Sequence, residues 1–119
     1  MFDHVVGFDA GDFTAVVDEI LEGFQVIAPD FRYLYLNEAA ARHGRSTREA
    51  LLGRTMMECY PGIEDTELFA LLRRSLADRT SHTLENAFTF PDGALGHFEL
   101  RIQPVPGGVC VLSIDLTAR

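Results

Sequence analysis

Basic residues are scarce in this sequence of 119 residues. Lys and Arg together number 10 against 18 Asp and Glu, which gives a formal net charge of −8. A chain with this charge repels the phosphate backbone of nucleic acids and also an anionic membrane surface. We therefore expect no nucleic-acid partner and no membrane partner for this domain.

Cysteine is also scarce. Cys59 and Cys110 are the only two, and both have apolar neighbours in the sequence. We interpret them as reduced, packed thiols rather than a disulfide, because free cysteine is among the most buried residue types. No CxxC pair and no Cys/His spacing predicts a metal site.

Long apolar runs are missing as well. No stretch approaches the roughly 20 residues that span a bilayer. The N-terminus has no basic region leading into an apolar segment, as a signal peptide would. These absences predict a cytoplasmic protein.

The length of the sequence fits one domain. Hydrophobic residues make up 47% of the chain, which is enough for a core.

The first clear pattern is an apolar stripe near the N-terminus. Its members recur at helical spacing and predict an amphipathic helix within residues 1–22: Phe13, Val16, Val17, Ile20 and Leu21. A helix with such a stripe needs an apolar surface to cover.

The rest of the sequence predicts an α+β domain. Alternation of apolar residues, turn residues and caps predicts strands at 24–28, 32–36, 84–90, 97–103 and 109–114, short helices at 38–43, 48–52 and 56–60, and a longer helix at 64–78. All strand links are hairpins except the one that carries the helices. A single five-stranded antiparallel sheet with the helices on one face satisfies this order.

Five short motifs follow one another along this pattern. They are Asn37-Glu38-Ala39-Ala40, Leu51-Leu52-Gly53-Arg54-Thr55, Phe90-Pro91-Asp92-Gly93, the strand from Phe98 to Val105, and Asp115-Leu116-Thr117. Each is weak alone, but in this order, over roughly residues 20–117, they resemble the PAS family. The resemblance implies the PAS fold, with a core at 23–117 and the start of a C-terminal linker at 118–119.

The resemblance also implies a function. PAS domains are sensory modules without catalytic activity, so we expect no enzyme here. They commonly form symmetric homodimers through an N-terminal helix. The signal would leave through Asp115 and Thr117 toward an effector domain, in cis or on a partner protein. A bacterial histidine kinase is the effector favoured by family frequency.

The cofactors known in the family each require residues that can be checked. Haem-binding members place a His on the long helix, and residues 64–78 contain none. Flavin photosensors carry a reactive Cys where this chain has Met56, and Cys59 is displaced by three residues. Haem and flavin are therefore disfavoured, and an unknown small ligand is what the resemblance leaves open.

A pocket for such a ligand is expected between sheet and helices. Its candidate residues are Tyr33, Tyr35, Met56, Met57, Tyr60, Phe69, Leu72, Asn86, Phe88, Phe98 and Leu100. Most of them are residue types that also form an ordinary core. By alternation Tyr33 and Tyr35 share one face. Asn86 either anchors a ligand or bonds neighbouring backbone. The aromatic and Met residues favour an apolar or aromatic ligand over a dicarboxylate.

Two other functions fit the sequence less well or only in part. The chain could be a pure dimerisation module with a filled core and no ligand. A small enzyme on a curved sheet would need a paired acid and base in a pocket. Glu85, Asp92 and Glu99 fall on turns or outward faces, so we predict no catalytic residue.

Overall fold

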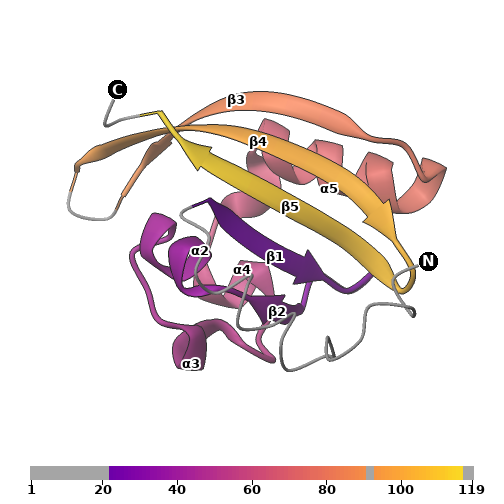
Figure 1. The fold of residues 1–119 in the computed structure, drawn as a ribbon, viewed down its shortest axis with the longest axis horizontal. Helices are drawn as coiled ribbons and strands as arrows, with labels where there is room; N and C mark the ends of the chain where they lie inside the picture. The colour runs from indigo at the N-terminus through magenta and orange to yellow at the C-terminus, as the bar shows by residue number, and fades with distance from the viewer. Residues whose placement is uncertain (1–21, 91–92, 117–119) are drawn as a thin grey trace, which may run out of the picture.

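The computed structural model describes residues 22–90 and 93–116, apart from the side chain of Phe88. Its elements in chain order (Figure 1) are β1 (Gly23–Ile27), β2 (Tyr33–Leu36), α2 (Glu38–His43), α3 (Arg48–Leu51), α4 (Met56–Cys59), η2 (Ile63–Asp65), α5 (Glu67–Asp78), β3 (His82–Thr89), β4 (Leu95–Val105) and β5 (Gly108–Asp115). This order confirms the predicted one. The predicted N-terminal helix, with Phe13, Val16, Val17, Ile20 and Leu21, lies outside the described residues, as does Thr117.

The strands form one antiparallel sheet in the order β2-β1-β5-β4-β3. Every described helix lies on the connection from β2 to β3. Figure 1 shows the long strands β3, β4 and β5 curving together, with α5 behind them and α2 to α4 beside β1 and β2. The last strand, β5, lies at the centre of the sheet, where it pairs with the first strand, β1, and with β4.

The core fills the space between the inner sheet face and the helices. In β4, buried Phe98, Leu100 and Ile102 alternate with exposed residues, as the period of two predicts. Phe69 and Leu72 of α5 are fully buried in the same cluster. The long helix begins later than predicted, because Thr66 has extended backbone and caps α5, which separates it from η2.

The face assignment in the first hairpin was wrong. Val26 pairs with Tyr35 but Ile27 pairs with Tyr33, so a β-bulge leaves Leu34 unpaired. Opposite residues of an antiparallel pair lie on the same sheet face. Tyr33 is consequently buried on the inner face. Tyr35 lies on the outer face, where its ring contacts that of Phe24 at 6.1 Å.

Asn37 attaches the first helix to the sheet. It is fully buried, and its Oδ1 accepts hydrogen bonds from the backbone N–H of Phe24 and of Ala40, both at 2.9 Å. Its Nδ2 donates to the carbonyl of Glu22 at 3.1 Å. One side chain thus caps α2 and fixes that helix against β1.

No described helix is long and apolar enough to cross a membrane.

Candidate ligand-binding cavity

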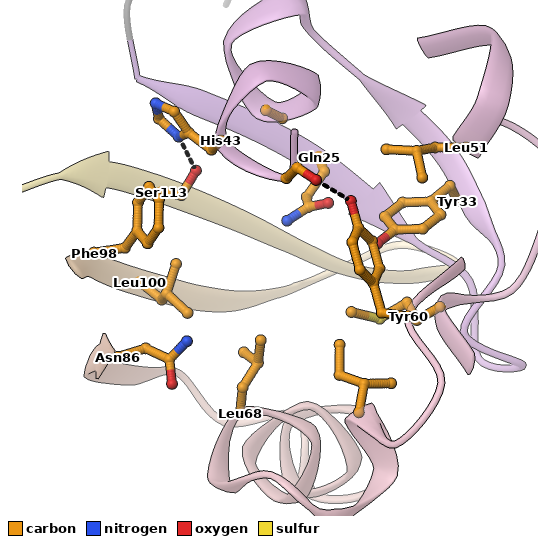
Figure 2. Close-up of a pocket in the computed structure, with 14 residues that line it drawn as sticks. Gln25, Tyr33, His43, Leu51, Tyr60, Leu68, Asn86, Phe98, Leu100 and Ser113 are labelled. Carbon is orange, nitrogen blue, oxygen red and sulfur yellow. Dashed lines mark hydrogen bonds between the residues drawn. The ribbon is translucent and has the colours of Figure 1, made fainter. Parts of the chain in front are cut away.

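A cavity of about 90 Å³ lies between the inner sheet face and the helices (Figure 2). Part of its wall is apolar and comes mainly from the helices: Ala40, Gly44, Leu51, Met56, Ile63 and Leu68, with Phe98 and Leu100 from β4. The rest is polar and comes from strands and helices: Gln25, Tyr33, His43, Tyr60, Asn86 and Ser113. None of these is an Asp, Glu, Lys or Arg, so within residues 22–90 and 93–116 no permanently ionised side chain lines the cavity.

The structure brings six of the predicted pocket residues to this cavity. They are Tyr33, Met56, Tyr60, Asn86, Phe98 and Leu100. Among the other candidates, Phe69 and Leu72 are core residues, and the ring of Phe69 stacks on that of Phe31 at 4.3 Å. Met57 packs against the core outside the cavity lining, and Tyr35 lies on the outer face. The side chain of Phe88 lies outside the described part.

Three polar residues of the lining were missed. Gln25 was not among the candidates, and regular alternation along β1 places it with Gly23 and Ile27 on the inner face, opposite Val111 of β5. Ser113 follows Val109 and Val111 on the inner face of β5, and a lone polar residue at that period was a usable signal. His43 is the last residue of a short helix, and the sequence does not indicate which way a side chain at that position points.

A polar contact joins the end of α2 to β5. His43 Nδ1 lies 2.9 Å from Ser113 Oγ, and the His43 ring lies 5.2 Å from that of Phe98. Gly23, opposite Ser113 in β1, makes room for the contact. A Cβ on Gly23 would overlap Ser113 Oγ and lie 3.0 Å from His43 Nδ1.

The titratable groups of the lining favour their neutral forms. Burial lowers the pKa of His43, an effect that nearby Asp115 partly opposes, so the imidazole is neutral at pH 7. Burial raises the pKa of Tyr60 to about 12 and the pKa of Tyr33 further still. The Tyr60 hydroxyl donates to the carbonyl of Gly44 at 2.9 Å. The described titratable residues of the lining are therefore neutral at pH 7.

Two side-chain amides line the cavity without a protein partner. Neither Gln25 nor Asn86 forms a side-chain hydrogen bond with another residue in the described part of the chain. Figure 2 shows Asn86 extending from β3 toward the space beside Leu68 and Leu100. Asn86 thus makes none of the backbone bonds that were one of its two predicted roles.

A second hollow, of about 260 Å³, adjoins the cavity. His43 and Phe98 line both, so these two side chains stand between them. The second hollow is bounded further by Arg42, Arg45, Phe90, Leu95, Gly96 and Asp115. Asp115 is the exposed last residue of β5, which places the predicted exit of the signal beside His43.

Cys59 is separate from the cavity. It is half-buried on α4 as a free thiol and is not part of the lining among the described residues. Burial raises its pKa, which disfavours the reactive thiolate. Cys110 on β5 is likewise a free, half-buried thiol with a pKa raised by burial.

The family of this chain follows from a comparison of its sequence with known families. The sequence matches the family described as the PAS fold over residues 17–119. The chain belongs to this family. No curated protein sequence matches this PAS domain.

Solved structures resemble the PAS domain in fold. VqmA of Vibrio cholerae, described as a dimer and as a LuxR-type receptor with a target DNA, matches with a TM-score of 0.77 at 17% identity, over 93% of this chain and 53% of VqmA. The chain thus spans about half the length of VqmA. A second VqmA structure, bound to DPO, has a TM-score of 0.75 at 18% identity, over 91% of this chain and 58% of that one.

Two further neighbours come from other signalling proteins. A domain of a sensory box histidine kinase/response regulator from Geobacter sulfurreducens matches with a TM-score of 0.75 at 18% identity, over 97% of this chain and 100% of that domain. An RNA-binding light-oxygen-voltage receptor matches with a TM-score of 0.71 at 21% identity, over 90% of this chain and 32% of the receptor. At these identities the likeness concerns the fold alone.

Proposed function

We propose that this PAS domain is a sensory module that binds a small molecule in its inner cavity and passes the occupied state to an effector. The observation that carries the proposal is the pair Gln25 and Asn86, two half-buried amides that line a cavity and have no partner in the described part of the chain. Both side chains are half-buried with polar atoms open to the cavity, so each can donate to or accept from a bound molecule.

The size and walls of the cavity limit the ligand. Its volume of about 90 Å³ is below the roughly 150 Å³ of an engineered cavity that binds benzene. The ligand is therefore small, or the cavity widens as it binds. Leucine, methionine and aromatic walls suit an apolar or aromatic molecule. VqmA, which is similar in fold, is described as bound to DPO, and this supports a ligand-binding function.

Two observations support a choice of effector: the solved structures with a similar fold, and the position at which the chain leaves β5. Asp115 ends β5 beside His43, so a change in the cavity can reach the segment that follows. A histidine kinase is the effector we favour, in cis or on a partner, because the Geobacter domain belongs to one. The neighbours with DNA or RNA targets extend the choice to nucleic-acid-binding effectors, although the charge of −8 keeps this domain itself away from phosphate. We place the domain in the cytoplasm and assign it no catalysis.

Dimerisation without a ligand is the second candidate function. The outer face of β1 and β5 carries half-buried apolar side chains: Phe24, Val26, Cys110, Leu112 and Ile114. Together with the predicted stripe of the N-terminal helix, this face could support a homodimer, and VqmA is a dimer. This candidate function differs from the first only in that no ligand binds in the cavity.

The ligand proposal is tested by titrating the protein with phenol and recording backbone amide chemical shifts by NMR. We expect saturable changes at Ala40 and Ser113, which line the cavity. Leu68→Trp should abolish them by filling the space, whereas Leu52→Trp, at an exposed position outside the lining, should not. Changes confined to the outer sheet face, or unaffected by Leu68→Trp, would contradict the proposal.

A further inference from the structure

The end of β5 presents two different polar side chains to His43. Ser113 and Asp115 are two residues apart in this strand, so they lie on the same sheet face, about 7 Å from each other. Phe98 of β4 pairs with Asp115, and its ring lies 5.2 Å from that of His43. The imidazole of His43 therefore lies near a neutral hydroxyl and, one step further along β5, near a carboxylate.

The position that His43 occupies in the structure suits a neutral ring. Its Nδ1 lies 2.9 Å from Oγ of Ser113, which is buried (Figure 2). The ring borders both the cavity and the second hollow, so it separates the two spaces. A buried hydroxyl can bond a neutral imidazole, but it supplies no charge to balance an imidazolium.

The surroundings of His43 act on its charge in opposite directions. Burial has the largest effect and holds the pKa of His43 below its ordinary value, whereas the Asp115 carboxylate raises it. An imidazolium in the present position is poorly hydrated, while Asp115 is exposed to water. Among the described residues, the charged groups that face His43 or border the second hollow with it are Asp115, Arg42, Glu22 and Arg45.

We propose that His43 is a pH-sensitive switch with two positions, bonded to Ser113 when neutral and beside Asp115 in the second hollow when protonated. The second hollow, of about 260 Å³, receives the ring when the side chain changes its rotamer. There the imidazolium gains water and a carboxylate partner, both of which favour the charged form. The proton is then a second signal, and the switch requires no ligand.

Protonation of His43 would change the cavity and the end of β5 together. Once the ring has rotated, it no longer separates the cavity from the second hollow, and Ser113 loses its partner. At the same time Asp115 gains an ion pair where β5 ends. The neutral and protonated states of the domain therefore differ at the segment that leads out of the fold.

The pKa of His43 in matched variants tests the switch, measured by NMR of the histidine rings between pH 8 and 5 without any ligand. Ser113→Ala removes the partner of the neutral ring, so the pKa should rise by about 0.5. Asp115→Asn removes the partner of the imidazolium, so the pKa should fall by a similar amount. Glu85→Gln removes one negative charge from an exposed position of β3 and should leave the pKa unchanged.

The direction of the first shift decides between two positions and one. A protonated ring that stayed at Ser113 would donate its Nδ1–H to Oγ, so Ser113→Ala would lower the pKa or leave it unchanged, and the proposal would be overturned. An unchanged pKa in Asp115→Asn would also overturn it, and this variant changes only an exposed side chain.

The backbone amide of Ser113 gives an independent measurement. Its chemical shift should follow the titration of the His43 ring in the parent protein, and this change should be absent from His43→Gln. The same titration curve in both proteins would contradict the switch. Because no ligand is added, each of these failures would leave the proposed ligand binding untouched.

Discussion

Two asparagines show how differently the same residue type can be used in one small domain. Asn37 is fully buried and forms three hydrogen bonds, with backbone groups of Glu22, of Phe24 in β1 and of Ala40 in α2. Asn86 is half-buried and bonds no other described residue. The first has a structural function. The second is available to a ligand.

This difference predicts opposite stabilities for two matched variants. Asn37→Ala removes the cap of α2 and leaves backbone groups without partners, so we expect a loss of about 2–4 kcal/mol in the free energy of unfolding. Asn86→Ala should change it by less than about 1 kcal/mol, because no hydrogen bond within the described protein is lost. Urea unfolding measures both. Equal losses would show that Asn86 is structural after all.

His43 makes the stability depend on pH. Its pKa in the folded protein lies below the value of about 6.5 expected for the unfolded chain. As the pH falls through 6.5, the unfolded state takes up a proton first, so the stability contributed by His43 is complete above this pH and is lost below it. The loss levels off below the folded pKa.

The measurement is urea unfolding of the parent protein and of His43→Gln between pH 5 and 8. The parent should gain stability relative to the variant as the pH rises, until the gain is complete above about pH 6.5, the pKa of the unfolded chain. Parallel stability curves would mean that His43 titrates alike in both states.

At the scale of the elements, α2 is held at both ends. Asn37 fixes its start to β1, and His43 fixes its end to β5 through Ser113. The second link depends on Gly23, since any Cβ there would enter the same space. The end of α2 is also where the cavity, the second hollow and Asp115 meet. Displacement of this helix end is therefore the structural change most directly coupled to the exit of β5.

Gly23→Ala tests this packing. The added methyl should cost about 1–3 kcal/mol of stability, as overpacking of a core does. Combining it with Ser113→Ala removes one overlapping atom, so the double variant should be more stable than the sum of the single losses predicts. Strictly additive losses in urea unfolding would show that Gly23 and Ser113 do not share this space.

Most elements could be predicted from sequence because their signals are local. Alternation located β4 and its inward Phe98, Leu100 and Ile102, and Asn37 marked the start of α2. The bulge after Val26 has no such signal. It depends on how β1 and β2 pair, and it places Tyr35 on the opposite sheet face from Tyr33. Local patterns thus predicted part of the apolar lining and part of the polar lining, such as Leu100 and Asn86. The remaining residues lie on helix ends, short helices and strand faces whose direction depends on tertiary packing.

At the scale of the whole molecule, the domain combines a packed sheet-and-helix core with one uncharged cavity near the end of its last strand. Buried strand residues and α5 supply the stability, and several core residues, among them Tyr33, Phe98 and Leu100, also line the cavity. The half-buried apolar residues of the outer sheet face lie away from the cavity. The two proposed functions, ligand binding and dimerisation, therefore involve different surfaces of the domain.

The most direct test of the central claim is the mass of the protein under native and denaturing conditions, after incubation with a small-molecule extract of cells and removal of unbound molecules. We predict an additional mass in the native protein that is lost on denaturation and is absent from Leu68→Trp. A native mass equal to the bare chain, or to twice it, with no additional mass would contradict the ligand claim, and only the doubled mass would support dimerisation as the alternative function.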